Sequence, residues 1–244
     1  MKHYVIATQQ PWGIKAFYSL PYDNGHWTMV GDEAWLEPTI DHVKARYAFF
    51  LNWSAIVPPE ILALTECVNF HCTALPCGRG GAPIENLLLR GHTETVITAH
   101  RMVEELDAGP IYGTRGPVSL GQIRYIAKPD TWFDAGTEAR LIDDYRPAMD
   151  SGLFMGQRQC QNPASEARVL GEVYTDEEIC GFDEFDVQPC DTKAEILERF
   201  IDPVVDLVRW IVAEEPEPYP QVGEVTTFKR LPKAEYKAFW KARA

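Results

Sequence analysis

Asn69 and His71 stand two positions apart at the end of a short apolar run, and Asp107 follows within a Leu-Asp-Ala-Gly stretch. Side chains alternate along an extended strand, so Asn69 and His71 are expected to point to the same face. An amide, an imidazole and a carboxylate can together polarise a carbonyl group, receive the negative charge that develops on its oxygen and move a proton. These residues therefore predict a site for chemistry at a carbonyl carbon.

The elements around Asn69 and His71 favour a buried parallel sheet. Residues 47–51 are apolar, Pro58 and Pro59 open a helix that we expect to end at Leu64, and residues 67–70 form a second apolar run. This is a strand, a helix and a strand. The polar triplet 69–71 is therefore expected at the carboxyl end of a parallel strand, where ligands bind in open α/β sheets.

Each of these residues also has a simpler interpretation. A buried histidine such as His71 is often structural, and Asp107 could cap a turn before Gly109. Arg79 could be an ordinary surface arginine. Cys72 follows His71 and could act as a thiol nucleophile, but neighbouring residues on a strand point to opposite faces, which disfavours a Cys-His pair.

Four longer stretches carry a family resemblance. They are Phe49-Phe50-x-x-Trp53-Ser54-x-x-Val57-Pro58, Phe70-His71-x-Thr73-x-Leu75-Pro76-x-Gly78-Arg79-Gly80-Gly81-x-Pro83-x-x-Asn86-Leu87, Glu105-Leu106-Asp107-Ala108-Gly109-Pro110-Ile111-Tyr112, and Pro216-x-Pro218-x-Pro220-Gln221-x-Gly223-Glu224 with Phe228-Lys229-Arg230. Through them the chain resembles the N10-formyltetrahydrofolate-dependent formyltransferases, and among these the sugar-nucleotide N-formyltransferases. Methionyl-tRNA formyltransferase and glycinamide ribonucleotide formyltransferase share the fold. The resemblance covers residues 47–119 and 191–230, and the first forty-five residues match only loosely.

The resemblance implies roles for individual residues. The implied catalytic trio is Asn69, His71 and Asp107. The residues expected to bind the formyl donor, N10-formyltetrahydrofolate, are Leu75, Pro76, Arg79, Gly80, Gly81 and Leu106. The candidate contacts of the acceptor are Trp12, Thr73 and Arg79. No metal is expected, and the six cysteines also lack the Cys-x-x-Cys spacing of a zinc site.

The expected reaction is transfer of the formyl group to a primary amine, in particular the amino group of a nucleotide-linked amino-deoxy sugar. Asn69 and a protonated His71 would receive the charge on the formyl oxygen, and Asp107 would accept a proton or keep the imidazole cationic. Three alternatives stay open. One is a formyltetrahydrofolate hydrolase, in which water replaces the amine. Another is a transferase for a different small amine, such as an aminated nucleotide or base. The third is a binding module without activity.

Composition and charge indicate the class of partner. The chain has 244 residues, 45% of them hydrophobic, and a formal net charge of −13. A protein that embraces tRNA must neutralise many phosphates with Lys and Arg. The chain also lacks the length for the separate carboxyl-terminal domain of methionyl-tRNA formyltransferases. We therefore expect a small-molecule acceptor and no nucleic acid. A homodimer is compatible with the sequence. No signal segment and no run of the ~18 apolar residues that a membrane span needs is visible, which predicts a cytoplasmic protein that does not bind membranes.

The expected fold class is α/β: a Rossmann-like, mostly parallel sheet with helices on both faces and a small β-rich insert. Residues 1–120 and 191–244 would form the catalytic domain, and residues 121–190 the insert. Residues 122–189 contain fourteen Asp and Glu and six Lys and Arg, a charge of −8. The strand-like runs are Ile123–Ile126, Ala139–Ile142, Leu153–Met155, Val169–Tyr174 and Phe182–Val187. The insert could serve association, acceptor recognition or no function of its own.

The residues after the insert are expected to have a structural role. Asp191 is expected to cap one long helix that runs to Val212 and is kinked at Pro203. A strand over Val225–Phe228 and a short polar helix from Lys233 should follow.

Overall fold

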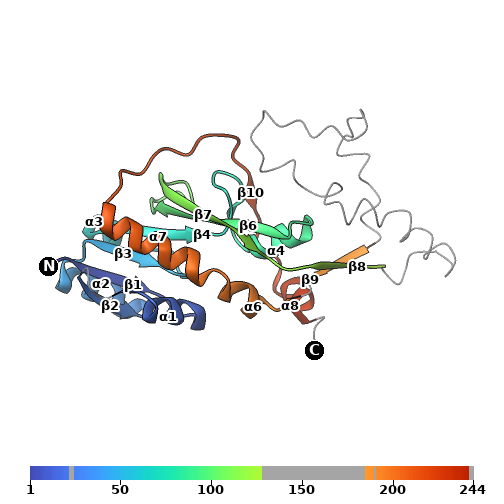
Figure 1. Cartoon of the computed structure of the whole chain (residues 1–244), viewed down its shortest axis with the longest axis horizontal. Coiled ribbons are helices and arrows are strands. Elements are labelled where there is room, and N and C mark those ends of the chain that lie inside the picture. Colours follow the sequence, from blue (N-terminus) through green and yellow to red (C-terminus); the bar gives the residue numbers. More distant parts are fainter. Residues whose placement is uncertain (22–24, 128–184, 190, 242–244) are drawn as a thin grey trace.

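A six-stranded sheet forms the centre of the protein. The computed structural model describes residues 1–21, 25–127, 185–189 and 191–241. The strand order is β2-β1-β3-β4-β6-β7 (Figure 1). The strands are β1 (His3–Ala7), β2 (His26–Val30), β3 (Tyr47–Phe50), β4 (Glu66–His71), β6 (Glu94–Arg101) and β7 (Ile111–Ser119). The first four pair in parallel, and β6 and β7 are antiparallel to their neighbours. The predicted Rossmann-like, mostly parallel sheet is confirmed.

Helices cover both faces of this sheet because the apolar side chains of its strands alternate. In β1, Tyr4 and Ile6 pack into one core cluster, and Val5 and Ala7 pack into the other. The first cluster includes residues of α1 (Pro11–Tyr18), α4 (Pro83–Leu89), α6 (Lys193–Glu198) and α7 (Ile201–Glu214). The second includes residues of α2 (Glu33–Val43) and α3 (Pro59–Leu64). Two hydrophobic layers thus hold the sheet rigid on either side.

The predicted unit of strand, helix and strand is confirmed by β3, α3 and β4. Strands β3 and β4 are parallel, with Phe50 opposite Asn69. Pro59 is the first residue of α3, where its fixed φ suits a helix and its missing N–H costs nothing. Strand β4 ends at His71, so the polar triplet lies at its carboxyl end, as the sequence predicts.

The prediction of one long helix with a kink at Pro203 is wrong. Two helices, α6 and α7, are present instead. Thr192 rather than Asp191 caps α6, in a capping box with Glu195. Helix α7 begins at Ile201, so Pro203 lies in its first turn, where proline removes no intrahelical hydrogen bond. The helix axis therefore breaks before Pro203 and not at it.

The segment from 215 to 226, here called the connector, leaves α7 and arches back over the molecule to β10 (Figure 1). Strand β10 (Thr227–Phe228) is two residues shorter than expected and pairs in parallel with β5 (Arg79–Gly80). The expected polar helix is present as α8 (Lys233–Lys241). The carboxyl-terminal part of the chain thus returns to the loop that follows β4.

Of the five expected strands of the insert, Ile123–Ile126 lies within the described residues, and so does the second half of Phe182–Val187. They correspond to β8 (Ile123–Ala127) and β9 (Phe185–Pro189), which pair antiparallel. The expected runs 139–142, 153–155 and 169–174 lie outside the described residues. The ends of the proposed insert meet, because a Cβ atom on Gly121 would lie 2.0 Å from Oδ2 of Asp191. Among the described helices, none has the length and apolar character to cross a membrane.

Candidate functional site

The three side chains that the sequence singles out meet at the carboxylate of Asp107. Nδ2 of Asn69 lies 3.4 Å from Oδ1 of Asp107, and Nδ1 of His71 lies 3.6 Å from Oδ2. His71 and Asp107 are buried, with 5% and 6% of their surface exposed, and Asn69 is half-buried. The end of β4 and the turn after β6 therefore place an amide, an imidazole and a carboxylate within one small volume.

His100, on β6, is a fourth member that sequence reasoning missed. It pairs with Asn69 across the antiparallel strands, and its Nε2 lies 3.3 Å from Nδ2 of Asn69 and 3.4 Å from Oδ1 of Asp107. Its Nδ1 lies 3.1 Å from the carbonyl oxygen of Arg101, which can only accept, so Nδ1 donates this bond. No local pattern in the sequence marks His100, because it joins the site through the pairing register of β4 and β6.

Asp107 is held on a tight turn. Its φ of +53° is in the left-handed region, which aspartate tolerates better than most residues. Gly109 completes the turn, since a Cβ atom there would lie 1.8 Å from the carbonyl oxygen of Arg101. The carboxylate accepts a hydrogen bond from the backbone N–H of Gly80 over 2.9 Å. This turn fixes the direction in which the carboxylate points.

The surroundings of Asp107 keep it ionised. Burial alone would raise the pKa of this carboxyl group. The hydrogen bond with His100, the neighbouring His71 and the N–H of Gly80 outweigh burial and lower the pKa to about 2. A negative charge is therefore present at the site at neutral pH.

The burial of His71 acts against protonation of its imidazole. Burial lowers its pKa, and the opposing effects of Asp107 and the Gly78 carbonyl are smaller. Its Nε2 lies 2.8 Å from the carbonyl oxygen of Gly78 and so carries the proton of the neutral ring. The lowered pKa favours the neutral ring, because the buried imidazole loses the hydration that would stabilise its charge, and the charge state of His71 during catalysis stays a prediction.

The predicted donor-binding loop lies against Asp107. Leu75 and Pro76 are buried. Arg79 is fixed on two sides: its Nε and Nη2 donate to Oε1 of Gln221 over 3.1 and 2.8 Å, and its Nη1 lies 3.1 Å from Oε1 of Glu105. Leu106, next to Asp107, is 68% exposed and presents an apolar side chain to solvent.

The two other candidate acceptor contacts are in the interior. Trp12 is buried and meets Phe200 edge to face. Thr73 is buried, and its hydroxyl donates to the carbonyl of Cys77 over 2.5 Å. Their assignment to the acceptor stays a prediction.

The thiol alternative finds no support in the geometry. Cys72 is buried, and burial raises the pKa of its thiol to about 12, so the nucleophilic thiolate is scarce at neutral pH. Within the described part of the chain, no group of three or more His, Cys, Asp or Glu side chains could hold a metal ion.

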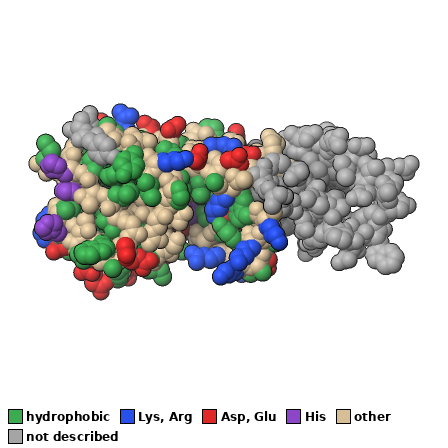
Figure 2. Space-filling view, turned by 90° about the horizontal axis from the view of Figure 1, so that it is seen from below, with side chains coloured by type: hydrophobic (Ala, Val, Ile, Leu, Met, Phe, Trp, Pro, Cys, Tyr) green, Lys and Arg blue, Asp and Glu red, His purple; other side chains and the backbone are tan. Residues whose placement is uncertain are grey.

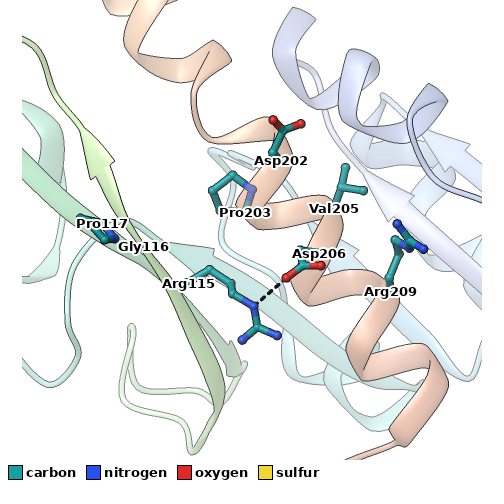
Figure 3. Close-up of a pocket in the computed structure, with 8 residues that line it drawn as sticks. All are labelled: Arg115, Gly116, Pro117, Asp202, Pro203, Val205, Asp206 and Arg209. Atoms are coloured by element: carbon teal, nitrogen blue, oxygen red, sulfur yellow. Dashed lines mark hydrogen bonds and ion pairs between the residues drawn. The ribbon is translucent and has the colours of Figure 1, made fainter.

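An open depression of about 490 Å³ lies elsewhere, between β7 and α7 (Figure 3). Arg115 points across it to Asp206, with Nε 2.7 Å from Oδ2. None of the predicted site residues lines it, so it is separate from the cluster around Asp107.

Part of the chain matches a known protein family. Residues 32–116 match the family model described as formyl transferase, and this range contains Asn69, His71, His100 and Asp107. A curated relative of this segment is methionyl-tRNA formyltransferase of Methylococcus capsulatus, 32% identical over 120 residues, which are 48% of this chain and 38% of the relative. The first curated relatives are matched over only 20% to 38% of their own length.

Solved structures of similar fold extend the comparison to the whole chain. Methionyl-tRNA formyltransferase from Clostridium thermocellum has a TM-score of 0.63 at 22% identity, over 96% of this chain and 75% of that one. A sugar N-formyltransferase from Shewanella sp. FDAARGOS_354 has a TM-score of 0.52 at 13% identity, over 98% of this chain and 79% of that one. At these identities the likeness establishes a common fold.

Proposed function

We propose that the protein transfers a formyl group from N10-formyltetrahydrofolate to a primary amine. The observation that carries this proposal is the convergence of Asn69, His71, His100 and Asp107 within 3.3 to 3.6 Å, inside the segment that matches the formyl transferase family. A donor amide, a neutral imidazole and an ionised carboxylate suit a reaction in which a carbonyl oxygen gains negative charge and an amine loses a proton.

The residues beside the cluster fit the proposed donor. A folate has a flat ring system that needs apolar surface, and exposed Leu106 supplies such surface next to Asp107. Arg79 could meet an anionic part of the donor, because its guanidinium is already oriented by Gln221 and Glu105. When bound, N10-formyltetrahydrofolate would supply an activated formyl carbon. Leu75, Pro76, Gly80 and Gly81 would border it.

Asn69, His71 and Asp107 would have different roles in the reaction. Among the described residues, the contacts of the Asn69 amide nitrogen are long, 3.3 and 3.4 Å, so its N–H groups can turn to a stronger acceptor, the formyl oxygen. Nδ1 of His71 has a free lone pair in the neutral ring and would take the proton of the attacking amine. The imidazolium so formed would be stabilised by Asp107 at 3.6 Å, which stays ionised because its pKa is about 2. It would return the proton to N10 of the donor as the bond between N10 and the formyl carbon breaks, so that tetrahydrofolate leaves.

We propose that the acceptor is small and anionic, in particular a nucleotide-linked amino-deoxy sugar. The chain's net charge of −13 disfavours a large polyanion such as tRNA. Lys and Arg side chains nevertheless gather toward one end of the face in Figure 2. Exposed Lys229 and Arg230 follow β10, and the Cβ atom of Arg230 lies 3.1 Å from the Cβ position of Gly81. A phosphate group near the donor loop would find cations there.

We further propose that residues 121–190 form a module separate from a catalytic domain of residues 1–120 and 191–244. The contact between Gly121 and Asp191 supports this division, because the chain leaves and re-enters the domain at one place.

The decisive experiment is incubation of the protein with N10-formyltetrahydrofolate and a panel of amines. The panel contains nucleotide-linked 3-amino and 4-amino sugars, aminated nucleotides, free amino sugars and methionyl-tRNA. Mass spectrometry should show the gain of one formyl group on an amino sugar nucleotide, with release of tetrahydrofolate. Formate release without any amine would select the hydrolase instead. Formylation of methionyl-tRNA alone would contradict the proposed acceptor, and no turnover at all would contradict formyl transfer.

A further inference from the structure

Gln221, in the connector, touches both the Asp107 turn and the predicted donor loop. Its Nε2 lies 2.8 Å from the carbonyl oxygen of Asp107 and 2.8 Å from that of Gly109. Its Oε1 accepts from Nε and Nη2 of Arg79. One side chain thus connects three segments that are far apart in the sequence.

Only an amide can make this set of contacts. Backbone carbonyls accept and a guanidinium donates, so the nitrogen and oxygen of Gln221 are placed without ambiguity. Both N–H groups and both lone pairs of the side-chain oxygen are used. An ionised glutamate would turn an acceptor toward two carbonyl oxygens, and leucine of similar size would make none of the four hydrogen bonds.

These contacts close a ring around Asp107. The carboxylate is held by the N–H of Gly80, the preceding Arg79 is held by Gln221, and Gln221 holds the backbone of Asp107. The left-handed backbone of Asp107 is costly for a residue with a side chain and persists only when its surroundings fix it. The Gln221 bonds to the carbonyls of residues 107 and 109 supply that restraint.

We propose that Gln221 is a positioning residue that sets the direction of the Asp107 carboxylate toward His71 and His100. It acts through Asp107 and does not touch the reacting atoms. The kinetic consequence rests on the proposed function, whereas the structural consequence does not.

The kinetic test compares Gln221→Leu and Gln221→Glu with Val222→Ala, a control at a connector residue that is 87% exposed. For both Gln221 variants kcat should fall at least about tenfold, equivalent to about 1.4 kcal/mol. KM for the donor should change less than about twofold in Gln221→Glu, which keeps the contact with Arg79, and should rise in Gln221→Leu, which releases Arg79. Protonation of the new carboxyl group in Gln221→Glu restores one donor, so its deficit relative to the native protein should shrink at lower pH, and that of Gln221→Leu should not. Native kcat in Gln221→Leu would overturn the proposal.

A second readout needs no activity. The imidazole resonances of His71 and His100 are followed against pH by NMR in the native protein and the three variants. We expect altered titration of at least one ring in the Gln221 variants and none in Val222→Ala. Unaltered titration in a folded Gln221 variant would overturn the proposal. If the native protein transfers no formyl group, the proposed function fails and this readout still decides the role of Gln221. Should Gln221→Leu not fold, Gln221→Glu carries the test, since it keeps the contact with Arg79.

Discussion

The backbone N–H of Gly80 donates to Oδ2 of Asp107 over 2.9 Å, and this bond joins the predicted donor loop to the predicted catalytic carboxylate. Gly80 has a φ of +105°, and a Cβ atom there would lie 2.5 Å from the carbonyl oxygen of Phe228 on β10. Glycine is therefore required for three segments to meet: the loop after β4, the turn after β6 and the returning carboxyl-terminal strand.

Replacement of Gly80 by alanine should consequently destabilise the protein. The strained backbone and the clash with Phe228 should together lower the free energy of unfolding by about 1–3 kcal/mol, measured by urea denaturation. Gly31→Ala is the matched control. Gly31 has no positive φ, and its nearest neighbour would be 3.4 Å away, so that variant should stay within about 0.5 kcal/mol of the native protein. Equal stability of the two variants would contradict the ring of contacts around Asp107.

Asn69→Ala and His71→Asn should each reduce formyl transfer at least about 100-fold, because each removes a group that acts only as charge develops in the transition state. Both proteins should still fold, as judged by circular dichroism and melting temperature. The measurement is kcat with the amine identified in the panel. Near-native turnover in either variant would refute the assignment of these residues.

Cys72→Ala tests the competing nucleophile at the next position. The buried thiol has a pKa of about 12, so we expect transfer within about twofold of the native rate once the folded fraction is taken into account. Loss of the thiol's packing should cost about 1 kcal/mol of stability. A fall in kcat as large as that of His71→Asn would revive the thiol mechanism.

The ionisation of Asp107 should make the free energy of unfolding depend on pH. Its pKa is lowered from 3.8 to about 2 in the folded protein, so its ionised form stabilises the fold above pH 4 by about 2 kcal/mol, and this stabilisation is lost as the pH falls toward 2. In Asp107→Asn, urea denaturation between pH 4 and 2 should show a shallower loss of stability than in the native protein. Glu105→Gln, at an exposed side chain, is the control. An unchanged slope in Asp107→Asn would show that the carboxylate is not stabilised by its neighbours.

The sequence predicted the residues of the site that lie within local patterns. Asn69 and His71 follow from alternation along one strand, and Asp107 from a short glycine-containing turn. His100 and Gln221 could not be predicted in this way. His100 depends on an antiparallel register between β4 and β6, and Gln221 reaches Asp107 from 114 positions further along the chain. Sequence periodicity carries no information about either contact.

The errors in the scaffold have a similar origin. The apolar spacing from Ile196 to Val212 is continuous, so it predicts one helix, whereas α7 starts anew at Ile201. The position of Pro203 in the first turn of a second helix depends on that break.

The segment between β8 and β9 provides the last prediction. Ala127 and Phe185 are partners at the end of this antiparallel pair, so residues 128–184 can be replaced by the two-residue turn Asn-Gly, which suits a hairpin. The shortened protein should fold, because closing a short loop costs less entropy than closing a long one. Folate should still raise its melting temperature, since a ligand that binds only the native state stabilises it.

The rate of formyl transfer in the shortened protein distinguishes the possible roles of residues 128–184. The trio lies on β4 and the turn after β6, outside the replaced residues, so partial transfer to the amine should remain if the segment is a tolerated insertion. Complete loss of transfer, with folding and folate binding intact, would assign acceptor recognition to residues 128–184. Loss of folate binding as well would contradict the proposed division into a catalytic domain and an insert. Ile56→Ser, a substitution at an exposed residue, is the control. Its folding, folate binding and transfer rate should equal those of the native protein.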